Sequence, residues 1–196
     1  MKKRMVSWLA AALCLSLAGC AVLPPERAAD GSAWDEGWVT VGGVLGVDTP
    51  EGLTPRENND ALSANGMFYA TWSMGEGETY ANEDGEDATL YDAQFYVLLA
   101  GASSADEAEK SAEEWLELAD SRYAVDGRFE KTYNGQPFTV LTYTYGSDTN
   151  PYQRGAFAYG VYRNFAVSVE LSCREGFTGD PPELLAEFLE HCHYGT

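Results

Sequence analysis

Two histidines flank a cysteine near the end of the chain, in the sequence EHCHYGT. His191, Cys192 and His193 are residue types that bind zinc, but a structural zinc site needs four ligands and no Cys-x-x-Cys pair completes this one. These two histidines are the only ones in the sequence, so they are the only imidazole groups that could act as a catalytic base. The sequence also has no Gly-x-Ser-x-Gly motif, the turn that carries a nucleophilic serine in many hydrolases. We therefore expect no metal, no cofactor and no catalytic residue.

A second group of candidate ligands lies in the acidic segment GEGETYANEDGED, residues 75–87. Calcium takes about six to eight oxygen ligands, and the carboxylates of this segment are Glu76, Glu78, Glu83, Asp84, Glu86 and Asp87. If Gly85 is aligned with the glycine of an EF-hand loop, Tyr80 and Tyr91 fall where acidic ligands are needed, so the segment is not an EF-hand. An irregular cation site and a solvated connector between strands are the two interpretations that this pattern leaves open.

The start of the chain has the pattern of an export signal. Lys2, Lys3 and Arg4 precede an uncharged run over residues 5–19, which is shorter than the ~20 residues that a membrane-spanning helix requires. A basic start, a short apolar stretch and small residues at its end are typical of a secretory signal peptide.

The last residues of this run, LAGC, resemble the bacterial lipoprotein box, in which the chain is cut before the cysteine and the cysteine receives a lipid. The resemblance implies a signal peptide over residues 1–19, a lipid anchor on Cys20 and a tether over residues 20–33. The alternative is an ordinary cleaved signal followed by an incidental cysteine. With the anchor, the protein would be held on the extracytoplasmic face of a bacterial cell membrane.

The remainder, residues 34–196, is long enough for a single domain with its own core. The whole sequence has a net charge of −19, and loss of the signal would make it three charges more negative. Such a surface repels nucleic acid and anionic headgroups, so no nucleic-acid partner is expected. In the simplest interpretation, the negative charge keeps the protein soluble. In the more specific one, it binds a cation or a basic partner.

The periodicity of the domain predicts strands and two helices. Aromatic and branched residues indicate strands over 66–73 and 90–100, with a weaker one over 39–47. From Ala105 the spacing changes to three and four residues, which predicts an amphipathic helix that begins at a Ser104 and Glu107 capping box. A second helix is predicted to start at Asp180, because an aspartate cap is followed by proline and then Glu183.

Two hairpins are predicted between these helices, one at Asn134-Gly135 and one at Arg163-Asn164. After the second turn, alternate residues from Phe165 to Cys173 are apolar and should face a core. Cys192 falls on the apolar face of the final helix, which should cover that strand. We therefore predict a disulfide between Cys173 and Cys192, on condition that their Cα atoms lie within ~7 Å.

A loop in the second half of the domain is a candidate interface. The sequence NPYQRGAFAYG, residues 150–160, contains Tyr152 and Arg154, which are residue types that protein interfaces favour. The alternative is a loop that enters a strand, with its aromatic residues in the core.

From Trp34 to Tyr194, the element order resembles the PsbP-like family, as do the phrases DAQFYVLLAG and AVSVELSC. The resemblance implies an α+β fold: an α/β/α sandwich on a largely antiparallel sheet of about six or seven strands, with two main helices. It also implies a non-enzymatic accessory or binding role, with an envelope protein as a possible partner. The alternatives are a cation- or small-ligand-binding lipoprotein that uses residues 75–87, and a hydrolase of envelope polymers that uses a carboxylate pair.

Overall fold

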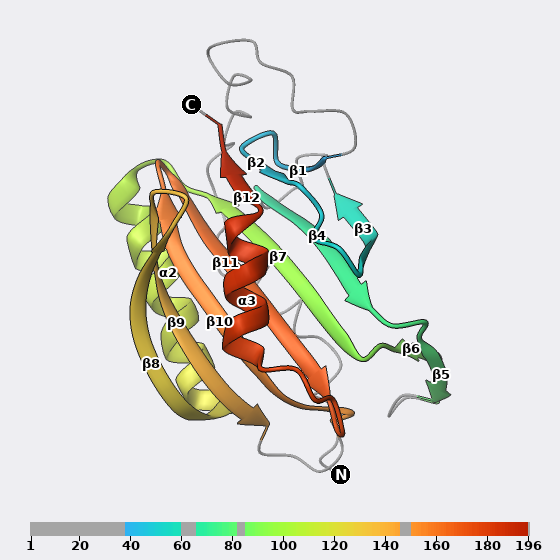
Figure 1. Cartoon of the computed structure of the whole chain (residues 1–196). Helices are drawn as coiled ribbons and strands as arrows, with labels where there is room; N and C mark the ends of the chain where they lie inside the picture. The colour runs from blue at the N-terminus through green and yellow to red at the C-terminus, as the bar shows by residue number, and fades with distance from the viewer. Residues whose placement is uncertain (1–37, 60–65, 82–84, 146–149, 196) are drawn as a thin grey trace.

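A seven-stranded antiparallel sheet forms the centre of the protein (Figure 1). The computed structural model describes residues 38–59, 66–81, 85–145 and 150–195. From one edge to the other, the strands are β3 (Leu53–Asn59), β4 (Met67–Met74), β7 (Ala93–Gly101), β11 (Phe165–Arg174), β10 (Tyr152–Tyr162), β9 (Gln136–Tyr145) and β8 (Tyr123–Tyr133).

Both predicted hairpin turns are present, and both depend on backbone with positive φ. The β8–β9 turn places Asn134 at φ 46° and Gly135 at φ 78°, and the β10–β11 turn places Arg163 at φ 55°. Asparagine and glycine reach this region at low cost. These two turns fix the registers of the four strands that form one side of the sheet.

Helix α2 (Ala105–Arg122) covers one face of the sheet where β10 and β11 lie. Its buried residues are Ala108, Ala112, Trp115 and Ala119, the set that the sequence spacing predicts. The predicted cap also forms, because the Ser104 side chain accepts a hydrogen bond from the Glu107 N–H. The Glu107 carboxylate in turn accepts from the Ser103 N–H. In the usual capping box the glutamate accepts from the N–H of the capping residue itself, which here would be Ser104.

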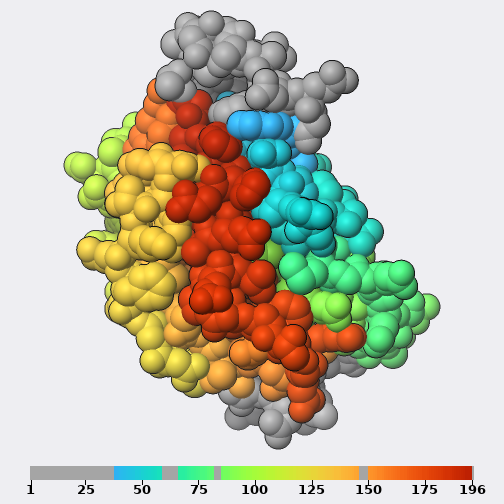
Figure 2. Space-filling model, in the orientation of Figure 1, coloured from blue at the N-terminus to red at the C-terminus, as the bar shows by residue number. Residues whose placement is uncertain are grey.

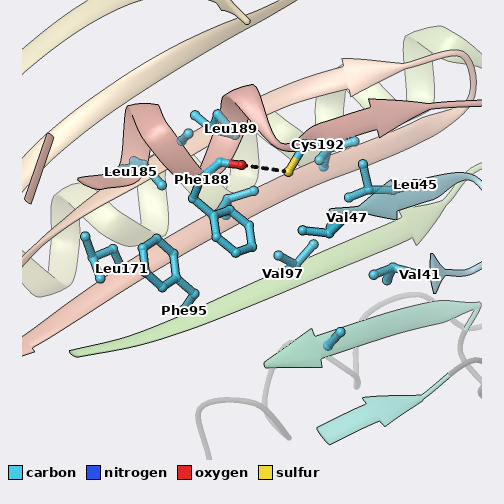
Figure 3. Packing of buried hydrophobic residues seen from close by; sticks show 14 of the residues in the cluster. Val41, Leu45, Val47, Phe95, Val97, Leu171, Leu185, Phe188, Leu189 and Cys192 are labelled. Carbon is cyan, nitrogen blue, oxygen red and sulfur yellow. Dashed lines mark hydrogen bonds between the residues drawn. The ribbon is translucent and has the colours of Figure 1, made fainter. Parts of the chain in front are cut away.

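Helix α3 (Pro181–Glu190) lies on the opposite face and crosses the middle of it (Figures 1 and 2). A small sheet covers the rest of this face with the order β1 (Val39–Val41), β2 (Leu45–Val47) and β12 (Cys192–Tyr194). Together they bury the main core, in which Phe188 stacks on Phe95 (Figure 3), with ring centroids 4.5 Å apart. Phe188 also meets Trp72 edge-on, at 5.0 Å.

The acidic segment contributes a separate two-stranded ribbon, β5 (Glu78–Ala81) and β6 (Asp87–Leu90), at one end of the sheet (Figure 1). The sequence predicts a single strand over 90–100, but the chain breaks between Leu90 and Ala93. The weak strand predicted over 39–47 is likewise two strands, because Gly42 and Gly43 both adopt positive φ and turn the chain.

The α+β class, the largely antiparallel sheet of seven strands and the two helices agree with the prediction. The coverage of the two faces is unequal, however. Helix α3 and the small sheet cover one face, whereas α2 packs mainly on β10 and β11 and leaves β3 and β4 beyond it. A sandwich with helices on both sides therefore describes only the β8–β11 half of the sheet.

The predicted Cys173–Cys192 disulfide is not formed, and both cysteines are buried free thiols. Both belong to the core beneath α3, as predicted. Cys173, however, lies at the end of β11 from which the chain leaves for α3, while Cys192 follows the other end of that helix. A ten-residue helix is about 15 Å long, which is more than a disulfide can span. The interface was predicted correctly, but the two cysteines occupy opposite ends of it.

Candidate functional site: a carboxylate bound by three tyrosines

A cluster of tyrosines surrounds Glu170 on the face of the sheet that carries α2. Glu170 lies in the middle of β11, between Phe157 of β10 and Tyr96 of β7. Its Oε1 accepts hydrogen bonds from the hydroxyls of Tyr143 at 2.7 Å, Tyr123 at 2.9 Å and Tyr145 at 3.4 Å. Three phenols thus converge on one oxygen of a half-buried carboxylate.

Stacking among the rings holds the phenols in place. Tyr123, the residue at the C-terminal end of α2, stacks on Tyr143 at 4.1 Å with an interplanar angle of 13°. Tyr145 meets Tyr123 and Tyr143 edge-on, at 5.0 and 5.4 Å. The Ser172 hydroxyl lies 3.2 Å from the Tyr145 hydroxyl and 3.5 Å from that of Tyr143. Aromatic packing and hydrogen bonding therefore support the same arrangement.

Gly155 makes this cluster possible. Tyr143 is in β9 and Glu170 is in β11, so the tyrosine ring must cross β10 to reach the carboxylate. It crosses at Gly155, where a Cβ atom would lie 2.5 Å from the Tyr143 hydroxyl and 2.1 Å from the Leu171 carbonyl oxygen. Every other amino acid would occupy the space through which the ring passes.

The environment of the tyrosines keeps them protonated. Burial, together with the charge of Glu170, raises the pKa of Tyr145 to about 12. The same two causes, with burial the larger, raise the pKa of Tyr123 and of Tyr143 above the ordinary value. A buried phenol beside a carboxylate loses its proton with difficulty because the product would be a second buried negative charge. Chemically, the three tyrosines act as hydrogen-bond donors to Glu170.

A tyrosine-rich, polar surface extends from this cluster over β7 and β4, the half of the face beyond α2. Tyr69 and Tyr96 stack at 5.7 Å with an interplanar angle of 16°, and both rings are half-buried. We call the surface formed by these two tyrosines, Gln94, Glu170 and Ser172 the open half-face. It brings two stacked phenol rings, a carboxylate, an amide and a hydroxyl together across three neighbouring strands.

The structure separates the three residues of the predicted zinc candidate. His191 Nδ1 lies 3.7 Å from an Asp48 carboxylate oxygen, and the His193 ring packs on Trp38 at 4.6 Å. The Cys192 thiol is buried and donates to the Phe188 carbonyl at 3.5 Å (Figure 3). Within the described part of the chain, no group of three or more His, Cys, Asp or Glu side chains is placed to hold a metal ion.

The acidic segment is anchored through one of its carboxylates. Arg174, at the end of β11, lies 3.4 Å from Glu78 and 2.8 Å from Asp92. Glu76, Glu86 and Asp87 are exposed. Glu83 and Asp84, which belong to the same segment, lie outside the described residues.

Tyr152 and Arg154 make internal contacts, which favours the loop-entry interpretation over an interface. The Tyr152 hydroxyl donates to Gln94 Oε1 at 3.2 Å. The Arg154 guanidinium donates to the Phe177 carbonyl and, at 2.9 Å, to the Gly179 carbonyl. Arg154 therefore holds the connection between β11 and α3, and Tyr152 orients the side chain of Gln94, one of the residues of the open half-face.

Other predicted features lie outside the described residues, namely the signal peptide, the tether and Cys20, the residue predicted to carry the lipid. Among the described helices, neither has the length and apolarity required to cross a bilayer.

Sequence reasoning missed the tyrosine cluster altogether. Its members come from three strands, β8, β9 and β11, with β10 between them, so their proximity depends on cross-strand registers that the sequence does not show. One signal was available: Gly155 interrupts an aromatic strand, and a glycine in such a place often marks a close approach of another group.

No protein-family model matches the sequence, and no curated protein matches it. The chain is similar to a solution structure of cyanobacterial PsbP (CyanoP) from Synechocystis sp. PCC 6803, with a TM-score of 0.40 and 11% identity. The alignment covers 75% of this chain and 95% of that chain. This is the family that the element order resembles, and the fold class follows from the strand order and the two helices of the chain itself.

Proposed function

We propose that this protein is a lipid-anchored, extracytoplasmic binding module, and that the open half-face is its contact surface for a basic envelope protein. The observation that carries the proposal is the stacked pair Tyr69 and Tyr96, which lies on β4 and β7, beyond the strands on which α2 mainly packs, and beside Glu170 of β11. Tyrosine is favoured at protein interfaces because one end of the side chain packs and the other forms hydrogen bonds.

Charge supports a basic partner. The whole sequence has a net charge of −19, and Glu170 supplies a carboxylate on the surface itself. Complementary charges accelerate association and exclude wrong partners. The lipoprotein box at Cys20 supports an extracytoplasmic location, where such a partner would be another protein of the envelope.

The chemistry of the two buried thiols supports a non-catalytic role. Burial raises the pKa of the Cys173 thiol to about 11, and burial alone raises the pKa of Cys192 above its ordinary value. Thiols must ionise to act as nucleophiles, and both cysteines are therefore unreactive near neutral pH. The tyrosines around Glu170 also stay protonated, because burial and the nearby carboxylate raise their pKa, and they therefore act as hydrogen-bond donors.

Site-specific photocrosslinking in the producing cell tests this function. A benzophenone amino acid would replace Tyr69 on the open half-face, and in a matched control it would replace the exposed Glu187 of α3 on the opposite face. We expect one envelope protein with a basic surface to be captured from position 69 and not from position 187. The Cys20→Ser chain should lose both membrane attachment and this capture.

Binding of the purified partner provides the decisive step. Tyr96→Ala in the full chain should weaken binding at least tenfold, and Glu187→Ala should leave it unchanged. Equal capture from both positions, or equal binding by both variants, would contradict the open half-face as the contact surface. Membrane attachment that survives Cys20→Ser would contradict the lipid anchor separately.

A further inference from the structure

The outermost strand β8 is a long edge with exposed side chains. It is the last strand in the order of the main sheet and runs for 11 residues (Figure 1). An edge strand presents a row of backbone N–H and C=O groups that a further strand can pair with. The side chains of residues 128–132 are all exposed, so this part of the edge is accessible.

The two edges of the sheet differ in their readiness to pair. At the other edge, β3 contains Pro55, and its pairing with β4 is irregular between Pro55 and Asn58. Proline and bulges are devices that prevent an edge from pairing. In β8 the irregularity is confined to the start, between Val125 and Gly127, and the strand pairs regularly with β9 from there to Tyr133.

Phe129 lies near the middle of β8 and is 41% exposed, which makes it the one exposed large hydrophobic residue of the described part of the chain. It lies opposite Val140 of β9, a residue of the core beneath α3, and therefore shares that face. Arg128 projects on the other face, where its guanidinium binds Asp120 of α2 at 2.7 Å. Glu130 is on the same face as Arg128 and has no ion-pair partner among the described residues.

Symmetry restricts how β8 can pair with β8 of a second copy. If the two copies are related by a two-fold axis perpendicular to the sheet, the two β8 strands are antiparallel and the same face of each sheet points the same way. In such a pair, one residue of β8 lies at the axis, directly opposite the same residue of the other copy. With Phe129 on the axis, Arg128 of each copy faces Glu130 of the other, and the two phenylalanines meet. With Arg128 or Glu130 on the axis, a like-charged pair would lie at the centre instead, which is unfavourable.

We propose that the chain forms a two-fold dimer by antiparallel pairing of β8 with β8 of a second copy, with Phe129 on the axis. The dimer would have one continuous sheet in which two Arg128–Glu130 pairs flank the joined phenylalanines. Arg128 can bind Asp120 and Glu130 together because a guanidinium has five N–H donors. This inference is independent of the proposed function, since β8 is at the opposite edge of the sheet from β3 and β4.

Cysteine crosslinking of the full chain in its membrane tests the register. Directly opposite residues of an antiparallel pair have Cα atoms about 4.5–5.5 Å apart, which suits a disulfide. Phe129→Cys should therefore form a disulfide-linked dimer under a mild oxidant such as copper phenanthroline. In the matched control Lys131→Cys, each new cysteine faces Gly127, and the two cysteines are about 13 Å apart along the strands. The dimer should still form, but no disulfide should link it. The unsubstituted chain gives the background from its own thiols.

Equal crosslinking of Phe129→Cys and Lys131→Cys, or none by Phe129→Cys, would overturn the proposal. Charge reversal gives a second, independent readout by light scattering and by crosslinking. Glu130→Arg should reduce the dimer at least fivefold, because it places Arg128 opposite arginine. The double change Arg128→Glu with Glu130→Arg restores opposite charges across the axis and should restore the dimer. The melting curve of the double variant shows whether it is folded. If it is folded and its dimer fraction is no higher than that of Glu130→Arg, this register is contradicted.

Discussion

At the scale of single residues, the most important polar group is the Glu170 carboxylate, because its hydrogen bonds join three strands, β8, β9 and β11. Glu170 is stabilised by tyrosines from β8 and β9, and the path of Tyr143 to it exists because residue 155 has no side chain. A half-buried carboxylate needs such partners, since an unpaired charge in that position would be costly. The glycine and the glutamate therefore form one structural unit although 15 positions separate them.

We predict that Gly155→Ala lowers the free energy of unfolding by about 3 kcal/mol, because the new Cβ meets backbone as well as the Tyr143 ring. Gly127→Ala is the matched control, since its Cβ would meet only the Thr142 hydroxyl, which can rotate away. The control should cost about 1 kcal/mol or less. Urea unfolding followed by tryptophan fluorescence measures both, and an equal cost for the two variants would contradict the role of Gly155.

The raised pKa values predict a loss of stability at alkaline pH. Tyrosines in the unfolded chain ionise near pH 10, whereas the pKa of Tyr145 in the folded protein is about 12. Between these values the unfolded state has lost a proton that the native state retains, so the free energy of unfolding falls as pH rises from about 10 to 12. Tyr145→Phe should make this decline shallower in urea titrations at pH 8 to 12. An unchanged slope would show that Tyr145 does not contribute.

At the scale of elements, the two helices begin with similar sequences and are capped differently. Both have a capping residue followed three positions later by glutamate, and the sequence predicts a helix start at each. In α2 the Ser104 side chain makes the capping hydrogen bond at 3.2 Å. In α3 the Asp180 side chain makes none, and the helix starts on Pro181.

Substitution of the two caps should therefore have unequal effects. Ser104→Ala should reduce the free energy of unfolding by about 1 kcal/mol, a typical value for loss of a cap. Asp180→Ala should change it by less than about 0.5 kcal/mol, as is usual for exposed positions without a specific contact. Thermal or urea unfolding distinguishes the two, and a larger effect at Asp180 would show that its carboxylate caps α3 in solution.

Elements with local signals could be predicted from the sequence, and those that depend on distant partners could not. The α2 spacing, the Asn134-Gly135 turn and the alternation after Phe165 are all local patterns, and the structure confirms each. Strand β12 is three residues long and exists because β2 lies beside it. The tyrosine cluster depends on the registers of four neighbouring strands. The disulfide prediction was wrong because the alternation of apolar residues shows which face of a strand or helix a residue lies on, but not which end of the helix it lies near.

At the scale of the whole molecule, the described elements cover the two faces of the sheet unequally: α3 and the small sheet cover one face, and α2 packs mainly on β10 and β11 of the other. Helix α3 and the small sheet bury Cys173 and Cys192 on the face that they cover, at opposite ends of the helix. Neither thiol can react unless that whole layer detaches, because both side chains are fully buried.

We predict that the two thiols become reactive together. Alkylation near pH 8 should be slow for both in native protein, and increasing urea should accelerate both along the same curve as global unfolding. Peptide mapping separates them from Cys14 and Cys20, and should also find both free in protein isolated without reductant. Faster labelling of Cys192 alone would show that the C-terminal strand opens independently, and recovery of a linked peptide would contradict the free thiols.

The position of β12 has a consequence for how the chain can fold while it is being made or exported. Strand β2 begins at Leu45, yet one of its two partners is the stretch Cys192–Tyr194, almost at the other end of the sequence. A chain that emerges with its N-terminus first must wait until residue 194 is available before this pairing closes, and such long-range contacts are slow to form. Until then the apolar residues of β2 lack one of their two partner strands, so β12 completes this part of the core.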